Sequence, residues 1–241
     1  MKQNTFISGF LIFLLMTSCC VYHPQLVDIP LIKKKNDLRI EAGISFVPTV
    51  HATISYGLTN EIAIQAFGST GSDDRKYFQI APGIYKDFGN QRVMELYGGF
   101  GSGYGNAYKD PNPGRMYGDY QLYFLQYNLG KYSTKSGHFD FGFGIKTGYF
   151  HSNLYEHNYY HDKPGSENEP FINYKENSIL LEPLAFFRVG GEKVKFSFKV
   201  GGCKIIKLAH PDIYVPACSL NVGFGINFSP KIKKGDIKKQ E

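Results

Sequence analysis

The sequence predicts an all-β protein, an antiparallel up-and-down transmembrane β-barrel of about ten strands with periplasmic N- and C-termini. Three observations lead to it. Apolar residues alternate with small or polar residues in many segments, the connections between those segments alternate between short and long, and the chain begins with an apolar leader. The composition agrees, because 27 Gly, 18 Tyr and 20 Phe among 241 residues are typical of strands and turns. The length suits one barrel domain.

Period-two alternation defines the strands, because successive side chains of a strand point to opposite faces. In one segment Phe139, Phe141 and Phe143 alternate with Asp140 and Gly142. Ten strands are expected, at 38–47, 50–57, 61–68, 76–87, 92–105, 117–132, 138–151, 176–189, 193–204 and 214–228.

Alternation alone does not say which face points outward. A soluble lipocalin-like barrel and a membrane barrel share the pattern with the faces exchanged. The polar faces here carry charges of both signs and many glycines, which suits a small polar interior. We therefore expect the apolar faces to point outward.

The lengths of the connections also favour a membrane barrel. Tight turns at 57–60, 88–91, 133–137 and 190–192 follow the even-numbered strands, and longer connections at 69–75, 106–116, 152–175 and 205–213 follow odd-numbered strands. Outer-membrane barrels have short periplasmic turns and longer outer loops. Strand one then runs outward from a periplasmic start, and an even strand number returns the C-terminus there. The first outer connection, Pro48-Thr49, departs from this pattern because it is short.

The last strand, Ser219 to Phe228 (SLNVGFGINF), resembles the C-terminal targeting strand of bacterial outer-membrane barrels. The matching residues are Asn221, Gly223, Ile226 and Phe228. The resemblance implies recognition by the barrel-assembly machinery and closure of the barrel against the first strand. Thirteen residues follow Phe228, whereas the signal usually ends the chain.

Residues 1–18 are interpreted as an export signal. Lys2 precedes the apolar run Phe6 to Met16, which is too short to span a bilayer as a helix. The run ends in Met16-Thr17-Ser18-Cys19, which resembles a bacterial lipobox. We expect lipidation of Cys19, because choosing Cys20 would put a cysteine at the cleavage position. An ordinary secretory signal with incidental cysteines is the alternative.

Residues 19–37 are expected to be a lipidated linker, residues 38–228 the barrel and residues 229–241 a basic tail. Pro24 and Pro30 oppose regular structure in the linker. Its Lys33–Lys35 run suits either a membrane surface or a solvated linker. The opening of the linker and the architecture of the chain resemble uncharacterised outer-membrane β-barrel lipoproteins of Bacteroides-type bacteria. That family has no agreed biochemical activity.

The net charge of +6 lies mostly in the flanking segments, since the 229–241 tail carries +3 and the barrel only about +1. No segment resembles a nucleic-acid-binding face.

The predicted lumen is polar and of mixed sign. Ten strands are near the narrow limit at which side chains fill a barrel, so we expect an ion-paired, plugged lumen, with a small pore as the alternative. The expected lumen charges are Arg39, Glu41, Glu95, Asp140, Lys146, Glu182, Arg188, Lys195 and Lys199.

Two further groups of residues carry chemistry that is typical of functional sites. His157, His161 and Asp162 hold metal-ligand chemistry, but their spacing would need a helix that the sequence does not favour. His151, Ser152 and Glu156 resemble the residues of membrane-embedded lipid hydrolases, but adjacent strand residues point to opposite faces. We expect no metal, no cofactor and no catalytic residues.

Cys203 and Cys218 flank the last hairpin. Even-numbered apolar residues on both strands put Cys203 on the lumen side and Cys218 on the lipid side, so we expect two free thiols; a disulfide between them, which would need a bulge, is the alternative.

The expected function is that of a lipid-anchored barrel of the cell outer membrane with a structural or surface-interaction role and no catalytic activity. Its partners would be outer-membrane lipids, the assembly machinery and a surface ligand bound by the external loops. The alternatives are a small-solute pore, a lipid-modifying barrel enzyme and a soluble periplasmic lipoprotein barrel that binds an apolar ligand.

Overall fold

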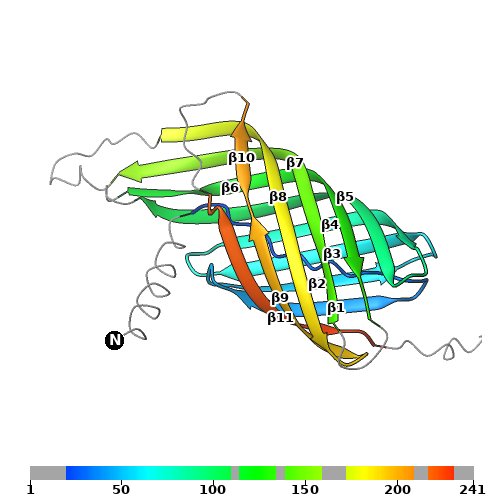
Figure 1. Cartoon of the computed structure of the whole chain (residues 1–241). Coiled ribbons are helices and arrows are strands. Elements are labelled where there is room, and N and C mark those ends of the chain that lie inside the picture. Colours follow the sequence, from blue (N-terminus) through cyan, green and yellow to red (C-terminus); the bar gives the residue numbers. More distant parts are fainter. Residues whose placement is uncertain (1–19, 110–113, 134–138, 159–171, 209–216, 231–241) are drawn as a thin grey trace, which may run out of the picture.

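The computed structural model shows a closed antiparallel up-and-down barrel (Figure 1). It describes residues 20–109, 114–133, 139–158, 172–208 and 217–230. Eleven strand segments form one sheet. Because β9 (Val194–Gly202) and β10 (Lys204–Lys207) are one strand interrupted at Cys203, the barrel wall has the ten strands that the alternation predicts.

The remaining strands follow in chain order, each hydrogen-bonded to the next along the chain. They are β1 (Leu38–Ser45), β2 (Thr49–Gly57), β3 (Ile62–Gly71), β4 (Lys76–Asp87), β5 (Arg92–Lys109), β6 (Gly114–Lys131), β7 (Phe139–Asn158), β8 (Ile172–Gly190) and β11 (Leu220–Phe228).

The barrel closes where β1 pairs with β11, in the register Ile40 opposite Phe228 through Ser45 opposite Gly223. The last strand, which also pairs with β9, therefore completes the barrel as predicted. In that hairpin Val200 lies opposite Val222. Residues of equal parity thus face one another, which confirms the register deduced from the apolar pattern.

The apolar faces point outward, as expected. Phe196 is 64% exposed and Phe143 50% exposed on the outer surface, whereas Glu41 and Lys199 are fully buried inside. Side chains of this kind surround the wall, from Ile44 on β1 to Phe224 on β11. A soluble barrel would place its apolar residues inside and its charges outside, so the faces contradict the lipocalin-like alternative.

The two ends of the barrel differ. At one end, called here the tight-turn end, Leu38 of β1 and Phe228 of β11 lie near the short turns, as the connection lengths predict. At the other, the long-connection end, β5 to β8 extend 18 to 20 residues, well beyond their predicted lengths. Much of the predicted loop at 152–175 is therefore strand, and the last strand begins at Leu220 in place of residue 214.

The segment before β1 gives the main correction. Residues 20–32, called here the inner segment, run inside the barrel with almost no regular secondary structure (Figure 1, dark blue). All thirteen are buried, Tyr22, Ile29 and Ile32 completely. Both interpretations of 19–37 as an external linker, on the membrane surface or in solvent, are wrong for this part. Among the described residues no helix is long and apolar enough to cross a membrane.

Candidate functional site: the lumen and the segment that fills it

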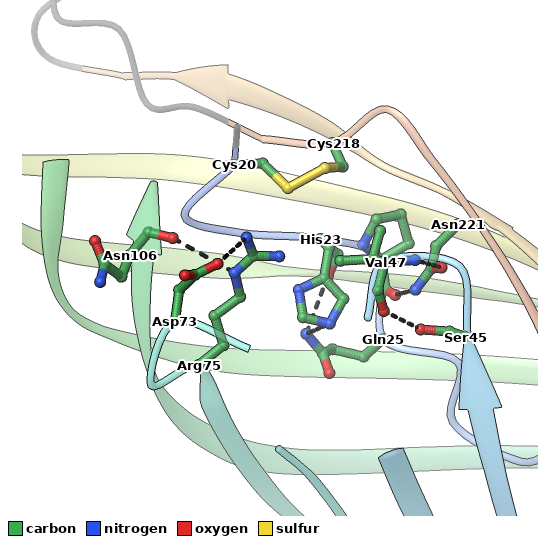
Figure 2. Close-up of a disulfide and its surroundings, with 11 residues drawn as sticks. Cys20, His23, Gln25, Ser45, Val47, Asp73, Arg75, Asn106, Cys218 and Asn221 are labelled. Carbon is green, nitrogen blue, oxygen red and sulfur yellow. Dashed lines mark hydrogen bonds and ion pairs between the residues drawn. A yellow bond between two sulfur atoms is a disulfide. The ribbon is translucent and has the colours of Figure 1, made fainter. Parts of the chain in front are cut away.

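The inner segment runs the length of the lumen against the direction of β1. It starts at the long-connection end, where Cys20 forms a disulfide with Cys218 in the connection before β11 (Figure 2). The Cys218 amide also donates to the Tyr22 carbonyl, at 2.8 Å. At the tight-turn end the Asn36 amide donates to the Gly57 carbonyl, also at 2.8 Å, and β1 then begins. Extended chain advances about 3.3 Å per residue, which lets this short segment cross a barrel.

The part near Cys20 is packed among aromatic rings. The ring of Tyr22 meets those of Tyr120 and Phe150 edge-on, with centroids 5.2 and 5.1 Å apart. Tyr120 also stacks with Tyr77 at 5.9 Å. Edge-to-face pairs of this kind add to the free energy gained by burial of the rings. The lumen is therefore closed by apolar packing at this level.

Further along, a buried ion pair fixes the inner segment. Arg188 of β8 contacts Asp28 at 2.6 Å and also donates to the Ile29 carbonyl. From the opposite wall, Gln65 donates to the Asp28 carbonyl at 2.9 Å, and the Asp28 amide donates to the Thr53 hydroxyl at 3.2 Å. Charge and hydrogen bonds together satisfy both the Asp28 carboxylate and its backbone, which burial requires.

Two wall carboxylates accept hydrogen bonds from backbone amides of the inner segment. Glu182 accepts from the Gln25 amide and Glu95 from the Ile32 amide, both at 2.8 Å. Lys146 pairs with the other oxygen of Glu182 at 2.7 Å, and Asn128 donates to the other oxygen of Glu95 at 3.0 Å. A segment outside any sheet needs partners for its amides. These inward acidic side chains supply them.

Lys199 joins the wall to the inner segment from β9. It pairs with Glu41 of β1 at 2.7 Å and donates to the Leu26 carbonyl at 2.5 Å. His51 of β2 lies 3.5 Å from the same carboxylate. The contacts therefore bridge the closing strands as well as holding the inner segment.

At the tight-turn end the lumen opens into a cavity of ≈ 910 Å³ whose lining includes Lys33–Lys35 and the pairs Arg39–Asp37 and Lys195–Asp140. Lys33 lies 4.0 Å above the ring of Tyr132. Burial, followed by the nearby Arg39, lowers the pKa of Lys33. Burial and a hydrogen bond to Asp87 raise the pKa of Tyr132 to about 12.

The predicted lumen charges lie as follows. Eight are buried, and Arg39 is half-buried at the tight-turn end. Eight of the nine have an ion-pair partner inside the set or within the segment before β1, and these are Arg39, Glu41, Lys199, Lys146, Glu182, Arg188, Asp140 and Lys195. Arg39 pairs with Asp37, and Glu95 is satisfied by amide donors. The plug, however, is a segment of chain, which the sequence interpretation did not include.

The cysteine prediction was half wrong. Cys203 has a free thiol, and it does not pair with Cys218, as expected. Cys218 is bonded to Cys20, whose Cα lies 5.5 Å away, in place of facing lipid as a free thiol. The error follows from placing the residues after Cys19 outside the barrel.

Among the described residues, His151 and Glu156 of the hydrolase-like group bond to residues outside that group. Ser152 is buried in the lumen, whereas His151 hydrogen-bonds Asn177 at 2.6 Å, and Glu156 accepts from Tyr174 at 3.0 Å. His157 belongs to β7, and His161 and Asp162 lie outside the described residues. Within the described part of the chain no group of three or more His, Cys, Asp or Glu side chains could hold a metal ion.

The residues of the predicted assembly signal lie on β11. Ile226 and Phe228 point outward, and Asn221 points inward and donates to the Pro24 carbonyl at 3.0 Å. Gly223 lies opposite Ser45 of β1. Cys19, the expected lipidation site, lies outside the described residues.

Two signals could have revealed the inner segment. It carries Leu26, Val27, Ile29, Leu31 and Ile32, which is too apolar for a solvated linker. The cysteine count is the other signal, because Cys20, Cys203 and Cys218 allow one disulfide among three possible pairs, and Cys20 is as much a candidate as the other two.

No family model and no curated protein matches the chain. Among solved structures, it is similar to the N-terminal β-barrel domain of Pseudomonas aeruginosa OprF, at 13% identity and a TM-score of 0.34, covering 81% of this chain and 98% of that one. It is also similar to the KdgM porin, at 10% identity and a TM-score of 0.34, covering 80% and 98%. A KdgM structure in complex with disordered oligogalacturonate gives a TM-score of 0.35, at the same identity and coverage.

Proposed function

We propose that the protein is a lipid-anchored β-barrel of the cell outer membrane with a structural or surface-interaction role and no catalytic activity. The outward apolar surface supports a membrane location, because water does not tolerate so large a continuous apolar surface. The leader and the closing strand point to the outer membrane. Membrane lipids, the assembly machinery and a surface ligand are its proposed partners, and the extended hairpins of β5–β6 and β7–β8 are the proposed contact surface.

The observation that carries this proposal is the filled lumen. Besides Cys20, seven apolar side chains of the inner segment are at most 2% exposed: Val21, Tyr22, Leu26, Val27, Ile29, Leu31 and Ile32. Burial of each contributes about 1.5–3 kcal/mol, so their removal from the lumen would cost on the order of 10 kcal/mol. Between Gln25 and Glu182 the packing leaves a cavity of only ≈ 10 Å³. A barrel closed this firmly is better suited to a structural role than to transport.

The small-solute pore is the second candidate. It is favoured by the ≈ 910 Å³ cavity, which would be a ready entrance at the tight-turn end. A pore would require the inner segment to leave the lumen. The free energy gained by burial of its apolar side chains opposes that.

Reconstitution into planar bilayers separates the two. We expect the purified full chain to insert, to show heat-modifiable gel migration and to produce no stepwise conductance, whether the disulfide is intact or reduced. Discrete conductance steps in the oxidised protein would contradict the closed barrel. A chain that stays in the soluble fraction after alkaline washing of membranes would contradict the membrane location.

The anchor and the orientation have separate tests. Cys19→Ala should abolish acyl labelling and signal-peptidase II processing, while Cys20→Ser keeps both. Protease added to intact cells should cleave near Asp162–Gly165 and leave the turn at Gly190–Gly191 intact. Normal acylation of the Cys19→Ala variant would refute the anchor, and the reverse cleavage pattern would invert the orientation.

A further inference from the structure

The inner segment places the start of the described chain at the long-connection end of the barrel. A linker outside the barrel would place it at the tight-turn end. We infer that the acyl anchor on Cys19 enters the membrane leaflet at the long-connection end, which is the outer leaflet, in place of the periplasmic leaflet. The inference rests on the lipidation and orientation of the proposed function, and it adds the side of the membrane that holds the anchor.

The position of Cys20 is fixed covalently. Its disulfide partner Cys218 belongs to the connection between β10 and β11, at the long-connection end. Tyr22 strengthens this position, because it forms a parallel bridge with Ala217 and its carbonyl accepts a hydrogen bond from the Cys218 amide. Cys20 itself is 2% exposed. The described chain therefore starts at this mouth of the barrel.

The rest of the inner segment prevents a different arrangement. Asp28 is held by Arg188 in mid-lumen, and the Ile32 amide by Glu95 closer to the tight-turn end. Withdrawal of the segment toward the tight-turn end would break these contacts and expose its seven buried apolar side chains. The loss of this apolar burial leaves the withdrawn state essentially unpopulated.

The wall beside Cys20 is low enough for an acyl chain to reach the membrane. β1 ends at Ser45 and β11 begins at Leu220, whereas β7 continues to Asn158 on another side of the barrel. Lipid-facing side chains reach this level, since Leu220 is 41% exposed and Leu208 57% exposed. The apolar outer surface therefore extends to the rim next to the disulfide.

The distances are short. Cys19 is about 4 Å from Cys20 between Cα atoms. Leu220 follows Cys218 by two residues, which is about 7 Å of extended chain. Acyl chains on Cys19 need only cross this rim to join the leaflet that surrounds Leu220. On the opposite side of the membrane they would have to pass the filled lumen.

The direct test is the linkage between two peptides from the full-length protein, isolated from cells and alkylated without reduction. After denaturation and trypsin digestion, Cys20 lies in the peptide 19–33 and Cys218 in the peptide 208–231. We expect one disulfide-linked species that contains both peptides and carries the acyl mass on Cys19. Cys203→Ala serves as the matched control, because it removes the free thiol and should leave the linked species unchanged.

The side of the membrane is measured in the same cells. An epitope inserted between Pro211 and Asp212, in the connection that contains Cys218, should bind antibody on intact cells. Acylated 19–33 that is never linked to 208–231 would overturn the inference, as would an epitope detected only after permeabilisation. Linked but unacylated peptide would instead refute the proposed lipidation and leave the path of the inner segment intact.

Discussion

The two halves of the inner segment are held in the lumen by different physical means. Near Cys20, Tyr22 packs among the rings of Tyr120 and Phe150. Nearer the tight-turn end, Asp28 pairs with Arg188. Apolar burial contributes free energy that depends little on the orientation of the groups. A buried ion pair contributes little net free energy, but it requires a specific distance and orientation. The comparison teaches that in the aromatic half the rings around Tyr22 contribute only stability, whereas in the charged half the Asp28–Arg188 pair adds a fixed register to the burial of Ile29 and Ile32.

The largest expected effect comes from the disulfide. Cys20 and Cys218 are 198 residues apart in sequence, and closing a loop of that length restricts the unfolded chain by up to about 5 kcal/mol. We expect Cys20→Ser to lower the free energy of unfolding by up to that amount, measured by urea titration in detergent with the heat-modifiable gel shift as readout. In the unreduced wild-type protein, only Cys203 among the described cysteines should react with maleimide after denaturation. Reaction at Cys218 would contradict the bond.

The aromatic half is tested at Tyr22. Tyr22→Ala should cost about 3–5 kcal/mol, because it removes a completely buried ring and leaves a cavity. Tyr22→Phe is the control. The Tyr22 hydroxyl is buried without a hydrogen-bond partner, so its loss should change the stability by less than about 1 kcal/mol. Equal losses in both variants would show that the hydroxyl, and not the ring, holds this half.

The charged half is tested by removing either one charge or both charges of the Asp28–Arg188 pair. Asp28→Ala leaves the Arg188 guanidinium buried without its carboxylate and should cost about 3 kcal/mol. The double variant Asp28→Ala with Arg188→Met removes both charges and should recover most of that loss. If the double variant is as unstable as the single one, the pair contributes net energy and the division between the two halves is not valid.

The smallest effect is expected at the mouth of the tight-turn end. Asp37 pairs with Arg39 at 3.1 Å where water reaches both side chains. Asp37→Ala should therefore lower the free energy of unfolding by no more than about 1 kcal/mol in the same titration. A loss comparable with that of Asp28→Ala would extend the charged half to residue 37.

The barrel could be predicted from the sequence because its signals are local. Phe139, Asp140 and Phe141 reveal their faces by alternation, and this held through the closing register of Ile40 with Phe228. The path of the inner segment has no such signal, since Pro24 and Pro30 interrupt every periodicity. Its position depends on contacts with partners far away in the sequence, such as Arg188 and Cys218. The charges were found from alternation, but the segment that they hold was not.

The disulfide between Cys20 and Cys218 constrains the order of assembly. The inner segment is the first part of the described chain, and Cys218 follows Cys20 by 198 residues. If the wall closed first, the Asp28 side chain would have to pass through the finished barrel. We therefore expect residues 20–32 to lie against the growing sheet before the seam forms. That seam is the short pairing of β1 with β11 over Ile40–Ser45, whereas β7 and β8 pair over Phe139–Glu156. Closure of that seam brings Cys218 to Cys20, so the disulfide can form only after the last strand has reached the start of the described chain.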